Sequence, residues 1–403
     1  MFRIRLIPFV LCAALLGGCA VTPRPATVPP RPEVPEVQVA PLAVQGLFPV
    51  SEEESRRLSK ALSPASQGLP SWKSMTFAVD QSLAHTRAKP ARRVAFGSSD
   101  VRITYGQMAN ALARLKTLLP LLDTEPELLA TEFRWMRMGP DFGFTGYYEP
   151  EIPASPVRTE RFKCPIYKTP PDLKKHRRGT YHTRHQIDCK GALRGRGLEL
   201  AWVEDAVDVF ILQIQGSGRL RYADGTVHYV LYDTQNGHKY VSLGRVMIDR
   251  GLLLREEVNM QAIRDWLRTH PESKTELLDT NPSYVFFKPG GAALAGNPTS
   301  DTPSGKGNKA GNGSRGSMGR LLTPWVSVAT DQGILPNGAL ALMHLRLPTQ
   351  AGETPFNALL LPQDTGGAIK RNRVDIFCGT GEKATYTAGY LNTKGAVFLL
   401  LPR

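Results

Sequence analysis

Residues 363–379 read QDTGGAIKRNRVDIFCG, and this stretch decides how the rest of the chain is interpreted. It carries two aspartates, Asp364 and Asp375, each of which lies beside an apolar run and near glycines. Residues 358–361 and 374–377 have the composition of short buried strands. The pattern therefore predicts two carboxyl groups that are held in a protein interior, and such groups are candidates for acid–base chemistry.

Each aspartate also has a purely structural interpretation. Asp364 would then cap the turn at Gly366 and Gly367, because a short acidic side chain readily hydrogen-bonds the backbone that follows it. A structural role for Asp375 is harder to explain, since an acid on an apolar strand needs a compensating reason to be there. The sequence leaves both interpretations open for Asp364 and favours chemistry for Asp375.

Composition and charge restrict the partners. The chain has 403 residues, of which 41% are hydrophobic and 21% are charged, as is usual for a soluble globular protein of two or three domains. The formal net charge is +14, which favours nucleic acid, anionic lipid or a carboxylate-rich polymer as a partner. Because no Lys/Arg-rich helix interleaved with aromatic residues is evident, we expect no nucleic-acid partner.

The N-terminus predicts export and lipidation. A short basic region and an apolar run are followed by Leu16-Gly17-Gly18-Cys19, which resembles a bacterial lipoprotein signal peptide with cleavage before Cys19. A plain secretory signal and a short membrane anchor are the alternatives. Ala20, where Asp would favour retention at the inner membrane, indicates a lipid anchor on the periplasmic face of the outer membrane. Proline-rich residues 19–50 then predict an extended tether.

The remaining sequence changes character twice. Capping-box patterns begin at Ser51, Thr104 and Thr124, and an apolar stripe at helical spacing predicts packed helices. Strand patterns follow, with an apolar run at 208–214 that leads into a hairpin around residues 223–225. The predicted divisions are residues 1–18 (signal peptide), 19–50 (tether), 51–133 (helical region), 134–288 (mainly strands), 289–320 (Gly/Asn-rich linker or insertion) and 321–403 (β domain).

Cysteine, metal and cofactor signals are weak. After removal of the signal and acylation of Cys19, an odd number of cysteines allows at most one bridge, and sequence proximity favours Cys164 with Cys189. His182 and His185 with Cys189 have the spacing of metal ligands, but the arginines and lysines around them favour a solvated loop. We therefore expect no metal centre, and since the sequence lacks a nucleotide-binding loop we expect no cofactor.

Several motifs in a fixed order resemble the membrane-bound lytic murein transglycosylases of type A, with their C-terminal three-aspartate domain. The resemblance covers residues 142–398, about two thirds of the chain. The motifs are Thr145-Gly146-Tyr147-Tyr148, residues 213–218, Asn236-Gly237-His238 with Tyr240, Ile248-Asp249-Arg250-Gly251, residues 281–288, and the segments around Asp364 and Asp375.

The resemblance implies both a fold and an activity. The implied fold is mainly β with N-terminal helices: a double-psi β-barrel, an inserted second β-barrel domain, and a glycan groove between them. The implied activity is that of a peptidoglycan lytic exotransglycosylase, which cleaves the β-1,4 bond between N-acetylmuramic acid and N-acetylglucosamine and leaves a 1,6-anhydromuramoyl end during cell-wall turnover and remodelling. The implied partners are glycan strands, the membrane through the lipid anchor, and a cell-wall synthesis or division complex.

Site residues also follow from the resemblance. The three aspartates that characterise the C-terminal domain match Asp331, Asp364 and Asp375, and the single acid/base matches Asp375. That role requires a carboxylic acid with a raised pKa, which burial among apolar neighbours supplies. Asp364 is expected to orient groups within the site. The residues expected to line the groove are Thr145, Gln213 and Gln215.

Two other functions remain open at this point. A hydrolase that used Asp364 and Asp375 as a pair of carboxylates would produce reducing ends instead of anhydro ends. A murein-binding lipoprotein without catalytic activity would bind sacculi and release nothing.

Overall fold

The structure is a computed structural model, and it describes residues 38–40, 42, 45–97, 101–173, 180–255, 257–294 and 313–403. These residues belong to one compact unit, Val34–Arg403. The predicted signal peptide, Cys19, most of the tether and much of the Gly/Asn-rich stretch lie outside the described residues. Within the described part of the chain, no helix is long and apolar enough to cross a membrane.

The N-terminal region is helical. Its elements are α1 (Glu52–Lys60), α2 (Thr76–Arg87), α3 (Tyr105–Leu118) and α4 (Leu128–Glu132), with short 3-10 turns at Pro64–Gln67 and Trp72–Met75 and a small two-stranded sheet of β2 (Val94–Gly97) and β3 (Arg102–Thr104). The capping box at Thr104 is confirmed, and Ser51 caps α1. The capping box at Thr124 is wrong: its hydroxyl donates back to the carbonyl of Leu121, and α4 begins only at Leu128.

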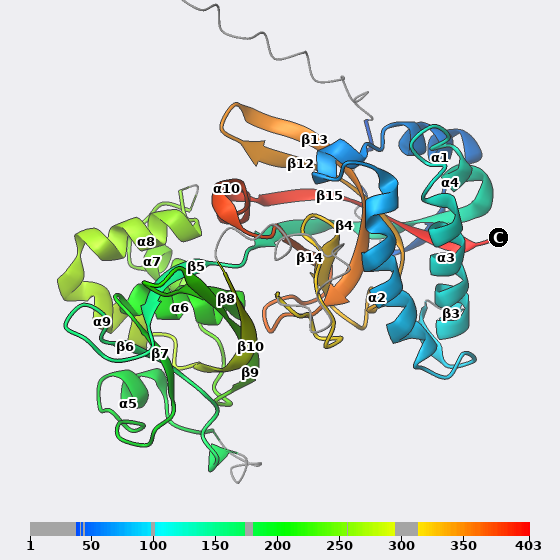
Figure 1. Ribbon diagram of the computed structural model, residues 1–403. Helices are drawn as coiled ribbons and strands as arrows, with labels where there is room; N and C mark the ends of the chain where they lie inside the picture. The colour runs from blue at the N-terminus through cyan, green and yellow to red at the C-terminus, as the bar shows by residue number, and fades with distance from the viewer. Residues whose placement is uncertain are drawn as a thin grey trace, which may run out of the picture. The chain divides into compact units, whose positions relative to one another are not determined.

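Seven strands form the first sheet, in the order β1-β4-β14-β11-β13-β12-β15, and β15 also pairs with β4, so six of them close on themselves. Figure 1 shows the hairpin of β12 and β13 beside β15. The pairs β4–β14 and β11–β13 are parallel and the other pairs are antiparallel. The strands are β1 (Gly46–Pro49), β4 (Phe133–Tyr147), β11 (Ser327–Thr330), β12 (Ala341–Thr349), β13 (Gly352–Asp364), β14 (Arg373–Phe377) and β15 (Asn392–Pro402).

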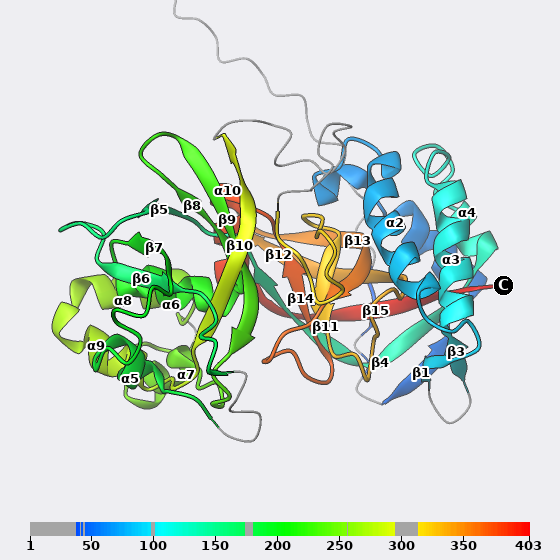
Figure 2. The same ribbon diagram turned by 60° about the horizontal axis from the view of Figure 1, so that its bottom comes forward.

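Strand β13 shows why these strands read as continuous apolar runs. Ala358 and Leu360 pack into the hydrophobic cluster that contains the β14 and β11 side chains, whereas Leu359 and Leu361 pack into a second cluster with α2 and α3. A strand that is buried on both faces loses the alternation of polar and apolar residues. Figure 2 shows α2 and α3 beside this sheet. The first sheet is therefore supported by the N-terminal helices.

Gln363 links the end of β13 to α2 through hydrogen bonds. Its side chain is fully buried, and its amide nitrogen donates to the carbonyl of Ala78 at 2.7 Å and to Oγ of Ser82 at 2.9 Å. A buried amide with satisfied hydrogen bonds holds its backbone in one position. The residue that follows, Asp364, is therefore anchored by the helical region.

A second sheet has the order β10-β9-β8-β5-β7-β6. A single bridge between Lys168, directly after β6, and Phe287 of β10 joins its two edges. The strands are β5 (Glu151–Ser155), β6 (Cys164–Tyr167), β7 (Glu199–Val203), β8 (Ser217–Arg221), β9 (Thr226–Gln235) and β10 (Val285–Leu294). The helices in this part of the chain are α5 (Arg184–Asp188), α6 (Ala206–Gln215), α7 (Leu243–Asp249), α8 (Met260–Thr269) and α9 (Pro271–Asp279); α10 (Gly381–Tyr390) follows later, between β14 and β15.

The structure corrects two predictions in this region. The apolar run at 208–214 belongs to helix α6, which starts after Asp205 accepts a hydrogen bond from the backbone of Val207 and ends at Gly216 with a φ of 80°. This helix is buried on nearly all sides and most of its residues are apolar, so its sequence resembles that of a buried strand. In addition, β10 continues to Leu294, and therefore the first residues of the predicted linker pair with β9. The hairpin between β8 and β9 is confirmed.

A buried ion pair joins the segment between β4 and β5 to β8 of the second sheet. Glu149 is 3% exposed and accepts a hydrogen bond from Nε of Arg219 at 2.7 Å. Its other carboxylate oxygen accepts a hydrogen bond from the Ser314 hydroxyl at 2.7 Å, and Ser314 also lies 2.7 Å from the Ser217 hydroxyl. The two sheets and the segment that returns to the first sheet thus meet at one hydrogen-bonded cluster.

Candidate active site

Strand register places the two aspartates on one face of the first sheet. Ala329 of β11 lies opposite Asp364 of β13 and also opposite Asp375 of β14. Thr145 of β4 lies opposite Asp375 on its other side. Because residues that lie opposite one another on neighbouring strands point to the same face, these side chains form one row. In this row Ala329 lies between Asp364 and Asp375 in strand order.

Asp375 combines burial with few hydrogen-bond donors. Burial raises its pKa to about 6, and the Thr145 hydrogen bond and the charge of Arg373 oppose that rise. The Thr145 hydroxyl donates to Oδ1 at 2.7 Å, and the Arg373 guanidinium in turn approaches the Thr145 oxygen at 3.4 Å. A carboxyl group in this environment can hold a proton close to neutral pH and can also release it.

Asp364 has more donors around it. Burial raises its pKa to about 6, against the effect of hydrogen bonds from Thr365, Ser317 and Tyr147, while the Asp375 charge adds to the rise. The backbone amides of Ser317 and Thr365 donate to Oδ1 at 2.7 and 2.8 Å, and the Tyr147 hydroxyl donates to Oδ2 at 2.9 Å. Asp364 does hydrogen-bond the following turn, so the structural interpretation of this residue describes part of what it does.

Asp331 holds the loop between the other two aspartates. It follows β11, and its carboxylate accepts hydrogen bonds from the backbone of Arg371 at 2.8 Å and of Gly333 at 3.0 Å. These bonds lower the pKa of Asp331. Arg371 has a φ of 57°, which is unfavourable for a side chain of its size. Asp331 therefore stabilises a strained residue two positions before Arg373.

The two glutamines belong to helix α6, not to the strands that form this row. Gln213 is buried in α6 and accepts a hydrogen bond from the Arg184 guanidinium at 2.6 Å. Gln215, at the end of α6, accepts a hydrogen bond from the backbone of Tyr148 at 3.0 Å, where the chain leaves β4. Both side chains are thus engaged in packing the second sheet and its junction with the first.

Two residues of this site are not among the predicted functional residues. Tyr147 lies two positions after Thr145 on the same strand, so it faces the same side, and its ring lies 5.2 Å from that of Phe377. That spacing could have identified it. Ser317 falls within the predicted linker and reaches Asp364 only through the tertiary fold. No local sequence pattern signals such a contact.

The cysteine pairing proposed from sequence proximity is wrong. Cys164 at the start of β6 and Cys189 at the end of α5 are both free thiols. The Cys164 thiol lies against the carbonyl of Glu204, while the Cys189 thiol lies against the carboxylate of Asp279. Cys378, near Asp375 in the sequence, is buried, and burial raises the pKa of its thiol well above the ordinary value. That thiol stays protonated.

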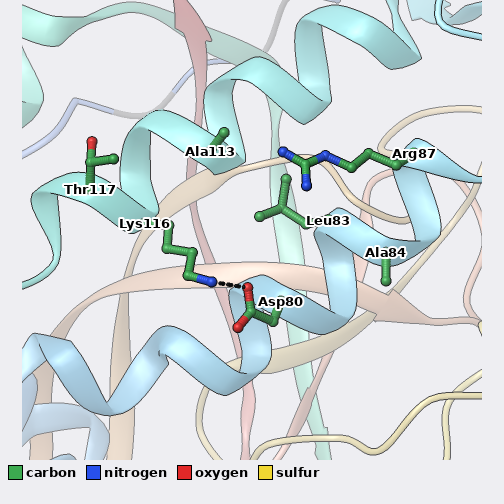
Figure 3. A pocket seen from close by; sticks show the side chains of 7 residues that line it. All are labelled: Asp80, Leu83, Ala84, Arg87, Ala113, Lys116 and Thr117. Carbon is green, nitrogen blue, oxygen red and sulfur yellow. Dashed lines mark hydrogen bonds and ion pairs between the residues drawn. The ribbon is translucent and has the colours of Figure 1, made fainter.

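A surface depression between α2 and α3 is a separate feature. It has a volume of about 720 Å³. Figure 3 shows the ion pair of Lys116 with Asp80 in its lining. Its other lining side chains are Leu83, Ala84, Arg87, Ala113 and Thr117. None of the three aspartates discussed above lines it, so it does not contribute to the chemistry of the row.

Comparison with known proteins assigns the chain to a family. Residues 143–288 match the MltA specific insert domain, and residues 326–401 match the 3D domain. The membrane-bound lytic murein transglycosylase A of Escherichia coli is 37% identical over 277 residues, which cover 66% of this chain and 68% of that protein. The chain belongs to the membrane-bound lytic murein transglycosylase A family. The member from Vibrio cholerae is 38% identical over 263 residues, or 64% of either chain.

Solved structures of the membrane-bound lytic murein transglycosylase A family have the same fold. A membrane-bound lytic murein transglycosylase from Agrobacterium tumefaciens aligns with 89% of this chain and 98% of its own, with a TM-score of 0.69 and 29% identity. E. coli MltA with bound chitohexaose aligns with 82% of this chain and 89% of its own, with a TM-score of 0.63 and 30% identity. The family predicted from the motifs is confirmed, together with a sheet-rich fold that includes helices.

Proposed function

We propose that this protein is a lytic transglycosylase that cleaves the β-1,4 bond between N-acetylmuramic acid and N-acetylglucosamine in peptidoglycan. The observation that carries this proposal is Asp375, whose pKa of about 6 suits a group that first donates and then accepts a proton. Family membership supports the reaction class, and the chitohexaose bound to the E. coli relative supports a glycan substrate.

In the proposed reaction, protonated Asp375 donates its proton to the glycosidic oxygen while the bond from that oxygen to the muramoyl anomeric carbon breaks. The N-acetylglucosamine leaves with a new hydroxyl group. The Asp375 carboxylate then accepts the proton of the muramoyl 6-hydroxyl, and that oxygen attacks the anomeric carbon. The product is a 1,6-anhydromuramoyl end, no water is consumed, and Asp375 is again protonated. A second carboxylate that activates water is therefore unnecessary, unlike in ordinary glycosidases.

The hydrogen bonds to Asp364 and Asp375 differ, and this difference supports a different role for each aspartate. Burial is the main cause of the raised pKa of Asp364, and the charge of Asp375 adds to that rise, so ionisation of Asp364 is less favourable while Asp375 is charged. Asp364 accepts hydrogen bonds from Ser317, Thr365 and Tyr147, which favour its ionised form, whereas Asp375 accepts one from Thr145. In this proposal the proton resides on Asp375, and the Asp364 carboxylate faces the positive charge that develops at the anomeric carbon.

The remaining details are part of the same proposal. The closed first sheet, with its two parallel pairings, is a double-psi β-barrel, and the second sheet is the inserted barrel. The glycan lies between them, along the face that carries the row of Asp364, Asp375 and Thr145. The relatives are named membrane-bound, and this chain is anchored through lipidated Cys19 to the periplasmic face of the outer membrane. Its net charge of +14 suits a substrate that is rich in peptide carboxylates.

The test is digestion of purified sacculi by the full chain, with the released muropeptides identified by mass. The proposal predicts anhydro-muropeptides from the parent protein and none from Asp375→Asn. Asp331→Asn is a matched control, because it removes a charge from a carboxyl group that holds the loop and does not face the glycan; it should retain the anhydro product at a reduced rate. Products that carry an added water would establish the paired-carboxylate hydrolase. Sacculus binding without any product would establish a binding protein.

A further inference from the structure

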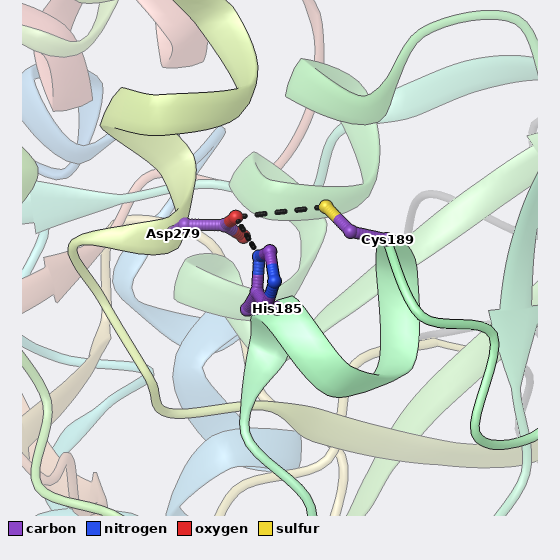
Figure 4. A group of neighbouring side chains, drawn as sticks. All are labelled: His185, Cys189 and Asp279. Atoms are coloured by element: carbon purple, nitrogen blue, oxygen red, sulfur yellow. Dashed lines mark hydrogen bonds and ion pairs between the residues drawn. The ribbon is translucent and has the colours of Figure 1, made fainter.

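A histidine, a cysteine and an aspartate lie close together in residues 151–294, which contain the second sheet and are called the second sheet domain below. All three are distant in sequence from Asp331, Asp364 and Asp375. His185 lies on α5, Cys189 follows directly after that helix, and Asp279 ends α9. One potential ligand atom from each residue lies within 4.8 Å of the other two. Figure 4 shows the three side chains pointing toward one another.

The helix geometry accounts for this arrangement. His185 and Cys189 are four residues apart, so they project from the same side of the α5 turn, which Thr183 caps with a complete capping box. Asp279 lies 94 residues after His185 in the sequence. It is followed by Asn281, whose carbonyl accepts a hydrogen bond from Arg184, so the two segments are fixed against each other. Hydrogen bonds therefore hold the two backbone segments that carry the cluster in fixed positions.

The contacts within the cluster converge on one oxygen. Nδ1 of His185 lies 2.6 Å from Oδ2 of Asp279, and Sγ of Cys189 lies 3.5 Å from the same oxygen. Tetrahedral zinc sites have ligands at about 2.0–2.3 Å from the ion, which places ligand atoms roughly 3.3–3.8 Å apart. Small rotations of three side chains would convert the present contacts to those separations. One divalent ion would then replace these direct contacts between the three side chains.

We propose that His185, Cys189 and Asp279 bind a divalent transition-metal ion of the zinc type. The ligands are the imidazole nitrogen, the thiolate and a carboxylate oxygen, a mixed set that suits zinc and cobalt. A thiolate and a carboxylate together balance the two positive charges of the ion. His185 is half-exposed and Asp279 is less so, which gives the ion access from solvent and leaves a fourth position for water.

The other histidine considered from the sequence, His182, does not join this set. Its ring lies against that of Tyr181, and its carbonyl accepts a hydrogen bond from Asn236. The sequence pattern contained two histidines and a cysteine, whereas the cluster in the structure contains one histidine, one cysteine and an aspartate from a distant segment. A bound ion would link α5 to the end of α9, and so would stabilise the second sheet domain against unfolding.

The test uses the untagged full chain in detergent, since a histidine tag would itself bind metal. Cobalt is added as the probe, because a cobalt–thiolate bond gives an absorption band that hydrated cobalt lacks. The proposal predicts one equivalent of bound cobalt, the thiolate band, and displacement of cobalt by zinc. Competition with a chromophoric chelator then measures the zinc affinity, and a thermal melt with and without zinc measures the effect on Tm.

Matched variants make the assignment specific. Cys189→Ser should abolish the thiolate band, and His185→Gln and Asp279→Asn should each weaken zinc binding by about tenfold or more. Cys164→Ser and His182→Gln are controls that should retain the band and the affinity. Circular dichroism of the metal-free variants shows whether each is folded. The proposal is overturned if the folded parent chain binds less than one equivalent, or if Cys189→Ser leaves the band and the zinc-dependent rise in Tm unchanged.

Discussion

Replacement of Asp375 by Asn should make the protein more stable at neutral pH while it removes activity. In the folded chain, burial raises the pKa of Asp375 from its ordinary value of 3.8 to about 6. The folded state therefore holds this proton more tightly than the unfolded chain does, and stability decreases as the pH rises from 3.8 through about 6. Above pH 6 the ionised Asp375 lowers the free energy of unfolding by at most about 3 kcal/mol, since each pKa unit corresponds to about 1.4 kcal/mol. This is an upper bound because part of the side chain reaches the surface.

Asn has nearly the same shape, and its Oδ1 can still accept the hydrogen bond from Thr145. Because Asn carries no charge at any pH, Asp375→Asn should be more stable than the parent by about 1–3 kcal/mol at pH 7.5 and nearly equal to it at pH 4. Urea unfolding followed by tryptophan fluorescence at several pH values measures this difference.

Asp331→Asn supplies the control of opposite sign. The backbone amides of Arg371 and Gly333 lower the pKa of Asp331, so its charge stabilises the folded state above pH 3.8. The Asn variant at this position should be less stable than the parent at pH 7.5, with a loss that shrinks as the pH falls. If Asp375→Asn gained no stability at pH 7.5, or gained the same amount at pH 4, then Asp375 would not be an acid with a raised pKa.

Three other substitutions each remove one contact, two of them at the aspartates and one at the buried ion pair of Glu149 with Arg219. Thr145→Val removes the donor to Asp375, so the alkaline limb of the pH–rate profile should move up by about one unit and kcat should fall about tenfold, whereas Thr145→Ser should resemble the parent. Tyr147→Phe removes a donor to Asp364 and should move the acidic limb of that profile upward by about one unit; an unmoved limb would exclude an ionised Asp364. Glu149→Gln removes one charge of a buried ion pair and should lower the free energy of unfolding in urea by about 3 kcal/mol, and a loss below about 1 kcal/mol would count against that pair as a support of the fold.

Sequence patterns predicted the local features well where a residue's role depends on near neighbours. The capping box at Thr104, the hairpin between β8 and β9 and the buried strands around Asp364 and Asp375 are all present. The strand prediction for residues 208–214 is wrong because a helix that is buried on nearly all sides resembles a buried strand in sequence. Thr124 matched a capping pattern, but its hydroxyl bonds backward along the chain.

Contacts between distant segments were beyond local patterns. The aspartates and Thr145 were chosen from sequence because motifs identify them, yet the row through Ala329 that aligns them arises from strand register. Ser317 reaches Asp364 from a stretch whose composition indicated only a linker. Asp279 similarly joins His185 across 94 residues, and neither spacing nor composition pairs the two.

The most direct test of the central claim is digestion of sacculi by the full chain in water enriched in oxygen-18. If the muramoyl 6-hydroxyl attacks the anomeric carbon after Asp375 has protonated the leaving group, the released muropeptides contain 1,6-anhydro ends and no heavy oxygen at those ends. Heavy oxygen at the new muramoyl ends would show that water is the nucleophile, and would contradict the account.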